Sequence, residues 1–540
     1  MAQTPFPGPR PSPGPDAAQR RRRLVLVVLA LLAAGAAAFL LLRGGEGPGA
    51  TGAARFVPDD ALAYIHVSTD PDREGVERAV GLGNRFPGFG RLRAAVLSRL
   101  ASAGRPVDFE RDIRPWLGDE AALALLNTRG TRAGSLIVLG VADRTRAQRF
   151  VRPPGRERKV ERYRGAQISR YGDVATAFVG DHLLIGQEAG LRQAIDVGAG
   201  RGTSLDDNPT FRRAMASLPE GRVADVYAPA AGMRRLLRPE GLPGAVRILL
   251  DKPALAGTAA AVTAEERRAR LTVHSVLDPA LARREPAPSR PFEPALERSL
   301  PIDALAYLGT TGLGRAVGRI LGLAQPAGFG DPAPLVARLR RDLVDGGVDL
   351  QEDLAPLFRR EVALVVTPSL PAPALTLVAA AGDEDATALA VSKLQEPLAE
   401  LFAPSGAGPG QVPTFTERDI GGVKAFSLRL APGLELNYAV FEGKLVVSTQ
   451  LGEIQRVRNS NGYLSDDDDF QAVMADRPKR VSSLVFLDFR QLLRLGERTG
   501  LGQDPAYLAV RPDLQKIRAV GAASTPGKNY TTVELVFDIS

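Results

Sequence analysis

One cassette occurs twice in this chain, and it restricts the possible fold more than any other feature. Val107–Leu125 reads VDFERDIRPWLGDEAALAL, and Val348–Val366 reads VDLQEDLAPLFRREVALVV. The two copies align without a gap, which places Glu120 of the first beside Glu361 of the second. Each copy predicts a short polar helix, a stop at proline and then a buried strand. The duplication therefore predicts two copies of one structural unit.

Other segments repeat in the same order along the chain. Pro58–Tyr64 (PDDALAY) corresponds to Pro301–Tyr307 (PIDALAY), and Asp181–Ile185 (DHLLI) corresponds to Gly443–Val447 (GKLVV). Short apolar stretches between turns rich in Gly and Asp predict strands that pair in antiparallel fashion. Helical stretches separate the groups of strands. The predicted fold class is therefore α+β, with two tandem copies of an antiparallel sheet and its helices.

The first copy and the end of the second give specific expectations for elements. Strands are expected at Ala121–Leu126, Leu136–Val141, Ala166–Ser169, Val174–Val179, His182–Ile185, Val223–Tyr227, Gly257–Val262, Arg270–Leu277, Ile517–Ala523 and Thr531–Ile539. Helices are expected at Arg144–Phe150, around Leu191–Asp196 and at Pro209–Ser217.

Composition divides the chain into six parts. They are a disordered Pro/Arg-rich tail (1–23), a transmembrane helix (24–42), a Gly-rich spacer (43–54), a first α+β unit (55–278), a Pro-rich linker (279–298) and a second α+β unit (299–540). Whether the two units pack as one body or as two is left open by the sequence.

The stretch Leu24–Leu42 contains no charged residue and predicts a membrane anchor. At about 1.5 Å per residue it reaches roughly 28 Å, which is close to the thickness of the hydrocarbon core. Arg20–Arg23 precede it, so the N-terminus is expected in the cytoplasm and the body outside the cell membrane. A cleavable signal peptide is the alternative, but further hydrophobic residues follow the small-residue run Ala36–Ala38.

Composition also excludes several kinds of chemistry. The chain has no cysteine, so thiol nucleophiles, thiolate zinc sites and cysteine-ligated iron–sulfur clusters are excluded. The net charge is +8, but six arginines and only two carboxylates lie in residues 1–50. The body therefore has a mild excess of positive charge, and we expect no nucleic-acid partner.

Two glycine-rich segments resemble phosphate-binding loops only superficially. Gly309–Gly318 follows a predicted strand, but no acidic residue stands where ribose recognition requires one. Gly521–Asn529 has the wrong spacing and lies between two predicted strands, which indicates a hairpin turn. The acidic run Asp466–Asp469 lacks the spacing of a calcium loop and is interpreted as helix capping. No cofactor and no metal site are therefore expected.

No motif identifies a catalytic centre. The three histidines, His66, His182 and His274, form no His-Glu-x-x-His pattern, and there is no Gly-x-Ser-x-Gly elbow. We interpret them as ordinary strand or turn residues, and Trp116 as a core side chain. Carboxylates from distant segments that meet in the folded protein remain a possible catalytic pair.

A basic strip extends over Arg144–Arg164 and includes two aromatic residues. Its candidate contacts to an anionic ligand are Arg152, Arg156, Arg158 and Lys159. Outside a membrane, such a strip could bind anionic lipid headgroups or anionic cell-wall polymers. The alternative is a solvated loop and helix face.

The opening motif, the Asp-x-x-x-Asp-[Ile/Leu]-x-Pro elbow and the Gly-Asp-His-Leu hairpin resemble the bacterial domain-of-unknown-function 3352 family. The resemblance covers roughly Ala54 to the C-terminus. It implies a single-pass protein with a large extracytoplasmic part, and no activity or catalytic residue.

These observations favour a membrane-anchored binding or scaffolding module of the cell envelope. One alternative is a carrier of lipids or other hydrophobic ligands, which would use the curved sheet as an apolar groove. Another is an envelope hydrolase with carboxylate catalysis, which needs a deep polar cleft and a carboxyl group with a raised pKa. The oligomeric state is not indicated.

Overall fold

The computed structural model describes eleven stretches of the chain, which are residues 52–70, 74–90, 109–127, 134–152, 158–236, 252–284, 290–311, 355–370, 372–401, 412–431 and 434–540. The expected anchor Leu24–Leu42 lies outside these stretches, as do the expected tail, most of the spacer and the segment after Thr311 that was compared with a phosphate loop. Within the described stretches, no helix combines the length and apolar character needed to span a bilayer.

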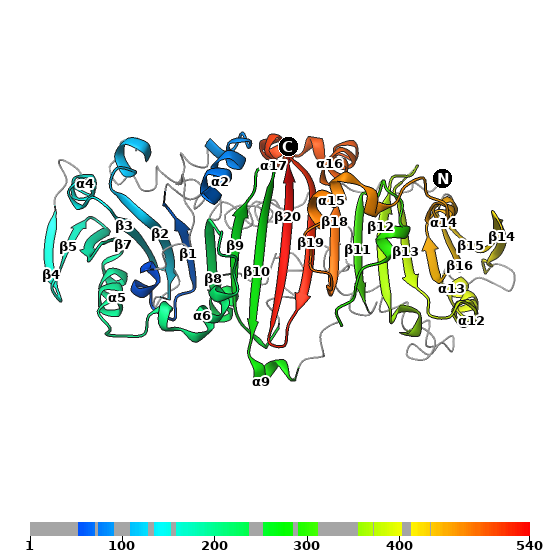
Figure 1. Cartoon of the computed structure of the whole chain (residues 1–540), viewed down its shortest axis with the longest axis horizontal. Coiled ribbons are helices and arrows are strands. Elements are labelled where there is room, and N and C mark those ends of the chain that lie inside the picture. The colour runs from blue at the N-terminus through cyan, green and yellow to red at the C-terminus, as the bar shows by residue number, and fades with distance from the viewer. Residues whose placement is uncertain are drawn as a thin grey trace, which may run out of the picture.

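Within the described stretches the strands form one antiparallel sheet of 20 strands (Figure 1). The strands of the first half are β1 (Ala63–Ser68), β2 (Leu117–Leu126), β3 (Gly134–Val141), β4 (Lys159–Tyr163), β5 (Ala166–Tyr171), β6 (Val174–Val179), β7 (His182–Gly186), β8 (Ala224–Pro229), β9 (Leu255–Ala264) and β10 (Arg268–Leu277). Those of the second half are β11 (Ala306–Thr311), β12 (Glu361–Thr367), β13 (Ala374–Ala380), β14 (Thr416–Ile420), β15 (Val423–Ala431), β16 (Leu434–Phe441), β17 (Lys444–Ser448), β18 (Ser483–Leu487), β19 (Ile517–Pro526) and β20 (Tyr530–Ile539).

The helices lie on both faces of this sheet. The α-helices are α2 (Glu74–Asn84), α4 (Arg144–Phe150), α5 (Glu188–Gly198), α6 (Pro209–Ala216), α7 (Ala230–Leu236), α9 (Pro279–Ala282), α12 (Glu384–Lys393), α13 (Gln395–Leu401), α14 (Leu451–Arg458), α15 (Asp468–Met474), α16 (Phe489–Arg498) and α17 (Pro505–Leu514). Short helical turns are η1 (Gly52–Phe56), η2 (Phe109–Ile113), η3 (Leu205–Asp207), η4 (Leu296–Ser299), η7 (Ala355–Phe358), η8 (Leu464–Asp466) and η9 (Leu501–Gln503).

The strand order is the same when the sheet is followed outward from its centre in either direction. In the first half it is β10-β9-β8-β1-β2-β3-β7-β6-β5-β4, and in the second it is β20-β19-β18-β11-β12-β13-β17-β16-β15-β14. The antiparallel pair β10–β20 joins the two halves at the centre. The body is therefore continuous, which answers the packing question that the sequence left open.

The apolar cores lie between the helices and the two faces of the sheet. On one face α5 and α6 cover the first half, where Leu191 and Phe211 are buried, and α14 and α15 cover the second half. On the opposite face α2 and α4 pack against the first half, and α12 packs against the second through Val391. Alternation of the strand side chains supplies both cores, because successive residues point to opposite faces.

Most element predictions are confirmed to within a few residues, including α4 and the meander β5–β6–β7. Trp116 is 1 % exposed and belongs to the core. The acidic run caps α15, since the Asp467 side chain accepts a hydrogen bond from the amide of Phe470. One correction concerns the secondary structure of the basic strip, whose alternative interpretation was a solvated loop and helix face. Part of it forms the edge strand β4, because the Arg164-Gly165 turn with two positive φ angles closes a hairpin with β5.

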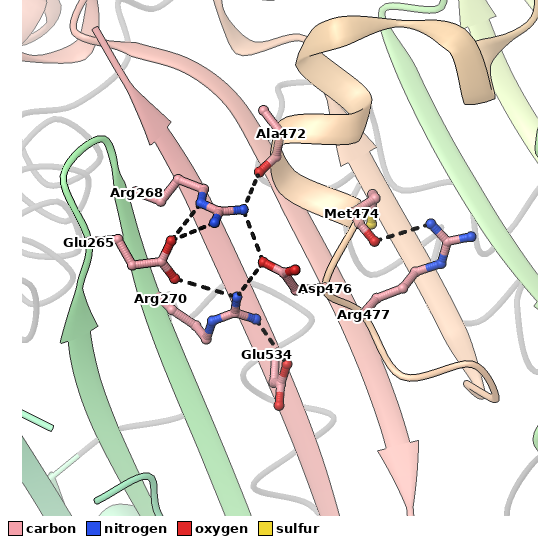
Figure 2. A network of polar contacts seen from close by, with 8 residues as sticks. All are labelled: Glu265, Arg268, Arg270, Ala472, Met474, Asp476, Arg477 and Glu534. Atoms are coloured by element: carbon pink, nitrogen blue, oxygen red, sulfur yellow. Dashed lines mark hydrogen bonds and ion pairs between the residues drawn. The ribbon is translucent and has the colours of Figure 1, made fainter. Parts of the chain in front are cut away.

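A polar network covers the junction between the halves (Figure 2). Asp476, just after α15, lies 3.0 Å from Arg268 and 3.4 Å from Arg270, both on β10. Arg270 also lies 3.3 Å from Glu534 on the neighbouring strand β20, and Arg268 pairs with Glu265. The carboxylate of Asp476 is half exposed, so its ion pairs with Arg268 and Arg270 contribute no more than about 1 kcal/mol each. The continuous sheet, and not this network, holds the halves together.

Candidate functional site

A group of buried charged side chains lies where β8, β1 and β2 run side by side. His66 on β1 faces Asp225 on β8, because the two residues are direct partners in the register. Nδ1 of His66 lies 3.1 Å from Oδ2 of Asp225, and Nε2 lies 3.5 Å from Oε2 of Glu120 on β2. Arg222 donates a hydrogen bond to the same Asp225 oxygen at 3.1 Å. The histidine is therefore enclosed between two carboxylates, and all three of these side chains are at most 5 % exposed.

Glu120 points toward His66 because it lies on the same face of β2 as Ala122 and Ala124, and side chains two positions apart point the same way. The pairing of β2 with β1 is regular through Glu120, whereas its pairing with β3 shifts register between Leu117 and Ala121. Strands β2 and β3 approach closely here. A Cβ atom on Gly118 would lie 2.9 Å from the carbonyl carbon of Gly140. Glycine at position 118 thus permits the close approach of β2 to β3.

The network continues from Glu120 to the surface. Nε2 of His182 on β7 lies 2.9 Å from Oε1 of Glu120, and Nδ1 lies 2.6 Å from Oδ1 of Asp181. Arg55 is 3.1 Å from the same Asp181 oxygen. His182 is buried, whereas Arg55 and Asp181 are exposed to solvent. A chain of alternating charges therefore leads from the interior of the sheet to its surface.

The pKa values follow from this arrangement. Burial by itself would lower the pKa of His66, but the charges and hydrogen bonds of Asp225 and Glu120 outweigh it and raise the pKa to about 9. Burial would raise the pKa of Glu120, but hydrogen bonds from His182, His66 and the Ala53 amide lower it to about 2. The pKa of His182 is also raised, because Glu120 and Asp181 outweigh its burial. At neutral pH the interior of this half therefore contains a protonated histidine and an ionised glutamate.

Glu120 also fixes the first described segment of the chain to the sheet. Its Oε2 accepts a hydrogen bond from the amide of Ala53 in η1 at 3.1 Å. Ala53 and Ala54 are fully buried, and the ring of Phe56 packs 5.0 Å from that of His182. We call Gly52–Phe56 the strap. It is held by a charge-assisted hydrogen bond in the interior and by apolar packing along its length.

The second half repeats the contact between the glutamate and the strap. Glu361, the counterpart of Glu120, accepts hydrogen bonds from the amides of Ala295 and Leu296 at 2.9 and 3.1 Å. Ala295 immediately precedes η4 and Leu296 is its first residue, while Ala53 is the second residue of η1. The repeated cassette thus places a buried carboxylate under a helical turn in each half.

The histidines and their carboxylate partner occur only in the first half. By strand register, the positions of His66, Asp225 and His182 in the first half correspond to Gly309, Leu484 and Lys444 in the second half. A side chain at position 309 would collide with the hydroxyl of Tyr307. Burial raises the pKa of Glu361, opposite to the direction for its counterpart. The glutamate therefore serves the shared architecture, and the histidines are an addition to one half.

The network holds a proton on His66 and balances the charges of the buried carboxylates. His66, Glu120 and Asp225 are enclosed by the sheet and its helices. The pKa of Glu120 is lowered, whereas a carboxyl acid catalyst needs a raised pKa. Within the described part of the chain, no His, Asp and Glu side chains are grouped as a metal site would require. The arrangement is that of a buried polar clamp.

The basic residues selected from the sequence lie elsewhere, at the far end of the sheet. Arg152 is exposed just after α4, and Lys159 is exposed at the start of β4. Arg158 is partly buried and donates a hydrogen bond to Ser169 at 3.2 Å. Arg156 lies outside the described residues.

Sequence reasoning missed the network because its members are far apart in the chain. His66 and Asp225 are separated by 159 residues, and His182 and Glu120 by 62. Single polar residues within apolar strands were the only signal, and two of the histidines were interpreted as ordinary strand or turn residues. The correction is that His66 and His182 are buried and each lies within 3.5 Å of two carboxylate side chains, which raise the pKa of both histidines.

Comparisons with known proteins give a family and distant structural likenesses. No curated protein matches the sequence. Crystal form I of TP0453 has a TM-score of 0.27 at 9 % identity, covering 42 % of this chain and 78 % of that one. Crystal form III has a TM-score of 0.25 at 11 % identity, covering 42 % and 79 %. Likenesses this weak say nothing about function. The model of a family described as "Protein of unknown function (DUF3352)" matches residues 24–539, so the chain belongs to the DUF3352 family.

Proposed function

We propose that the protein is a single-pass membrane protein whose body is a rigid binding or scaffolding module in the cell envelope. The hydrophobic stretch Leu24–Leu42 supports the anchor, and Arg20–Arg23 before it support a body outside the cell membrane. The 20 described strands form one sheet with apolar cores on both faces, and this supports a rigid module.

The observation that carries this proposal is the burial of the strap. Residues 43–51 separate the end of the hydrophobic stretch from Gly52, and they extend at most about 30 Å. In the strap Ala53, Ala54 and Phe56 are buried, and the amide of Ala53 donates a hydrogen bond to Glu120. The tether therefore ends in a fixed point of the sheet, so the body is held close to the bilayer at a defined attachment site.

We also propose that the two halves are copies of one unit, with the boundaries expected from the sequence. Matching ring contacts support this. Each half has a tyrosine whose ring meets a phenylalanine edge-on, and that phenylalanine meets a third ring in the same way. The three rings are Tyr64, Phe211 and Tyr227 in one half and Tyr307, Phe470 and Phe486 in the other. The duplication gives the module two similar ends.

Membrane anchoring and orientation are tested together in cells that make the full chain. After alkaline carbonate extraction the protein should remain in the membrane pellet. Protease added outside spheroplasts should digest the body. A version with Leu24–Leu42 replaced by a Gly/Ser segment of equal length should lose membrane retention. Release of the intact protein by carbonate, or protection of the body from external protease, would remove the proposal.

A second candidate function is contact with anionic ligands at the β4 end. Arg149, Arg152, Lys159 and Arg162 are exposed there, and no described residue pairs with their charges. Lipid headgroups and wall polymers share phosphate chemistry, which suits such cations. The detergent-solubilised full chain can be titrated with poly(glycerol phosphate) and with short-chain phosphatidylglycerol to separate the two sources.

The variant for this test replaces Arg149, Arg152 and Lys159 with Gln, and it leaves Arg158 in place because that side chain is hydrogen-bonded to Ser169. Its control replaces Arg213, Arg283 and Arg284, three exposed arginines elsewhere, with Gln. At low salt the first variant should lose roughly tenfold in affinity for at least one probe, and the control should lose little. Equal losses in both variants would reduce the effect to net charge, and unchanged binding would eliminate the candidate.

A further inference from the structure

The sheet ends in two short strands whose outer edges pair with no described strand. β4 and β14 lie at opposite ends of the molecule (Figure 1). β4 pairs only with β5, and β14 pairs only with β15. Each strand has five residues, and the first four are exposed. Outward backbone N–H and C=O groups on such an edge can accept a further strand.

The turns at these ends determine which backbone groups point outward. Tyr163 pairs with Ala166 across a two-residue turn with positive φ angles, and Ile420 pairs with Val423 across Gly421-Gly422 in the same way. In such hairpins the closing residues exchange hydrogen bonds with each other. Beyond the closing pair, the backbone N–H and C=O groups of successive residues point alternately outward and toward the paired strand. The outward groups are therefore those of Val160 and Arg162 on β4 and those of Glu417 and Asp419 on β14.

We propose that β14 of one copy pairs in antiparallel fashion with β4 of a second copy, so that molecules join head to tail. In the register with Val160 opposite Asp419, the outward groups of the two strands meet. Arg162 then faces Glu417, and Glu161 faces Arg418. Both are pairs of opposite charge at direct cross-strand positions, which favour pairing. The pairing depends on the two sheet ends and not on the membrane anchor of the proposed function.

The faces of the sheet also match in this register. Tyr163 packs against the core that α5 and α6 cover, and Ile420 packs against the core that α14 and α15 cover. Glu161 and Arg418 lie on the same faces as these residues, because side chains two positions apart point the same way. The joint would therefore place these helix layers on one side, as the β10–β20 pair does at the centre of each molecule.

The charges select against pairing of identical ends. Two β4 strands paired through their outward groups would place Glu161 opposite Glu161. Two β14 strands would place Arg418 opposite Arg418 and Glu417 opposite Asp419. Like charges directly opposite one another destabilise a sheet. Among the registers that pair both outward residues of each strand, β4 with β14 is the complementary combination, and a contact between unlike ends continues as an open row.

The strength of this contact is limited. Within one molecule Glu161 already lies 2.8 Å from Arg192, and Glu417 lies 3.1 Å from Lys424. Carboxylates accept several hydrogen bonds, so these pairs can persist in the joint. Two five-residue strands bury far less surface than a stable interface needs. The rows should therefore form where the protein is concentrated, as on a membrane.

The absence of cysteine from the chain makes the test direct. Glu161→Cys and Arg418→Cys introduce thiols at positions that face each other without exchanging backbone hydrogen bonds, where Cβ atoms are about 4.5–5.5 Å apart. In membranes containing the full chain with both substitutions, mild oxidation should give a ladder of dimers, trimers and longer species. Co-expression of the two single variants should give dimers only.

The control is Glu161→Cys with Glu417→Cys, because these side chains would lie on opposite faces. It should cross-link at least about fivefold less. No ladder from folded protein, or equally strong dimers from Glu161→Cys alone, would overturn the proposal. A second measurement uses charge. Arg418→Glu should reduce self-association of the detergent-solubilised chain in sedimentation, and adding Glu161→Arg should restore it. If both variants remain folded and Glu161→Arg does not restore self-association, the proposal is also overturned.

Discussion

His66 and Asp225 form a buried ion pair, with 3.1 Å between Nδ1 and Oδ2, at sites where the other half of the sheet has Gly309 and Leu484. The same architecture thus accommodates a charged pair in one half and none in the other. A buried ion pair is not needed for this fold, but once present it makes each partner depend on the other.

Removal of one partner should therefore cost more than removal of both. Asp225→Ala leaves a protonated histidine with one carboxylate fewer, and we expect a loss of about 3–5 kcal/mol in the free energy of unfolding. The double variant His66→Leu/Asp225→Leu should lose less, because it leaves neither charge in the interior. Denaturant titrations of the three proteins measure this. A single variant within about 1 kcal/mol of the wild type would contradict the prediction.

Stability should fall as the pH rises above neutrality. The pKa of His66 is about 9 in the folded protein against an ordinary value of 6.5. Its contribution, roughly 3 kcal/mol, is complete below pH 6.5 and is lost as the pH rises through 9. The pKa of Glu120 is about 2 against 4.5, so its contribution is complete above pH 4.5 and is lost as the pH falls through 2.

Unfolding by urea at a series of pH values from about 2 to 10 measures both limits. Stability should be highest between about pH 4.5 and 6.5. The variant His66→Leu/Asp225→Leu should show a shallower decline on the alkaline side. Its residual slope comes from His182, whose pKa is also raised. An identical alkaline slope in the variant would show that His66 is not the responsible group.

Glu120 and Glu361 offer a matched comparison of the two straps. Glu120→Gln keeps an acceptor for the Ala53 amide but removes the charge between two histidines, so we expect a loss of about 2–4 kcal/mol. Glu361→Gln removes a charge that faces backbone amides, from a group whose pKa is raised, so we expect a change within about 1 kcal/mol.

Limited proteolysis gives a local readout for the same pair. Trypsin should cut after Arg55 faster in Glu120→Gln than in the wild type, because the strap is less firmly held. Glu361→Gln should leave the rate at Arg55 unchanged. Equal rates in all three proteins would show that Glu120 does not control the docking of the strap.

Two helical glycines should respond to alanine in opposite directions. At Gly232 in α7 a Cβ would collide with the carbonyl of Leu62, so Gly232→Ala should destabilise the protein by about 2–3 kcal/mol. At Gly81 in α2 the space is open, so Gly81→Ala should stabilise it by about 0.5–1 kcal/mol. Thermal unfolding of the two variants tests the signs. Destabilisation by Gly81→Ala would contradict the packing described for α2.

The strands and their turns could be predicted from the sequence because their signals are local. Apolar stretches such as Leu136–Val141 alternate with glycine turns, and the caps of α15 follow from carboxylates directly before it. β4 was missed because its first four residues are exposed and three of them are charged, so its sequence lacks the apolar alternation of a half-buried strand. It forms because a tight turn returns the chain along β5.

The sequence by itself determined a mixed α and β fold with antiparallel strands, the hydrophobic stretch Leu24–Leu42 and the absence of thiol chemistry. Only the tertiary structure decided that all described strands form one sheet and that His66, Glu120, His182 and Asp225 share its interior. The reason is the range of the contacts. Pairing of β10 with β20, and of β1 with β8, joins residues separated by long stretches of chain, and no local pattern specifies which distant strands become neighbours.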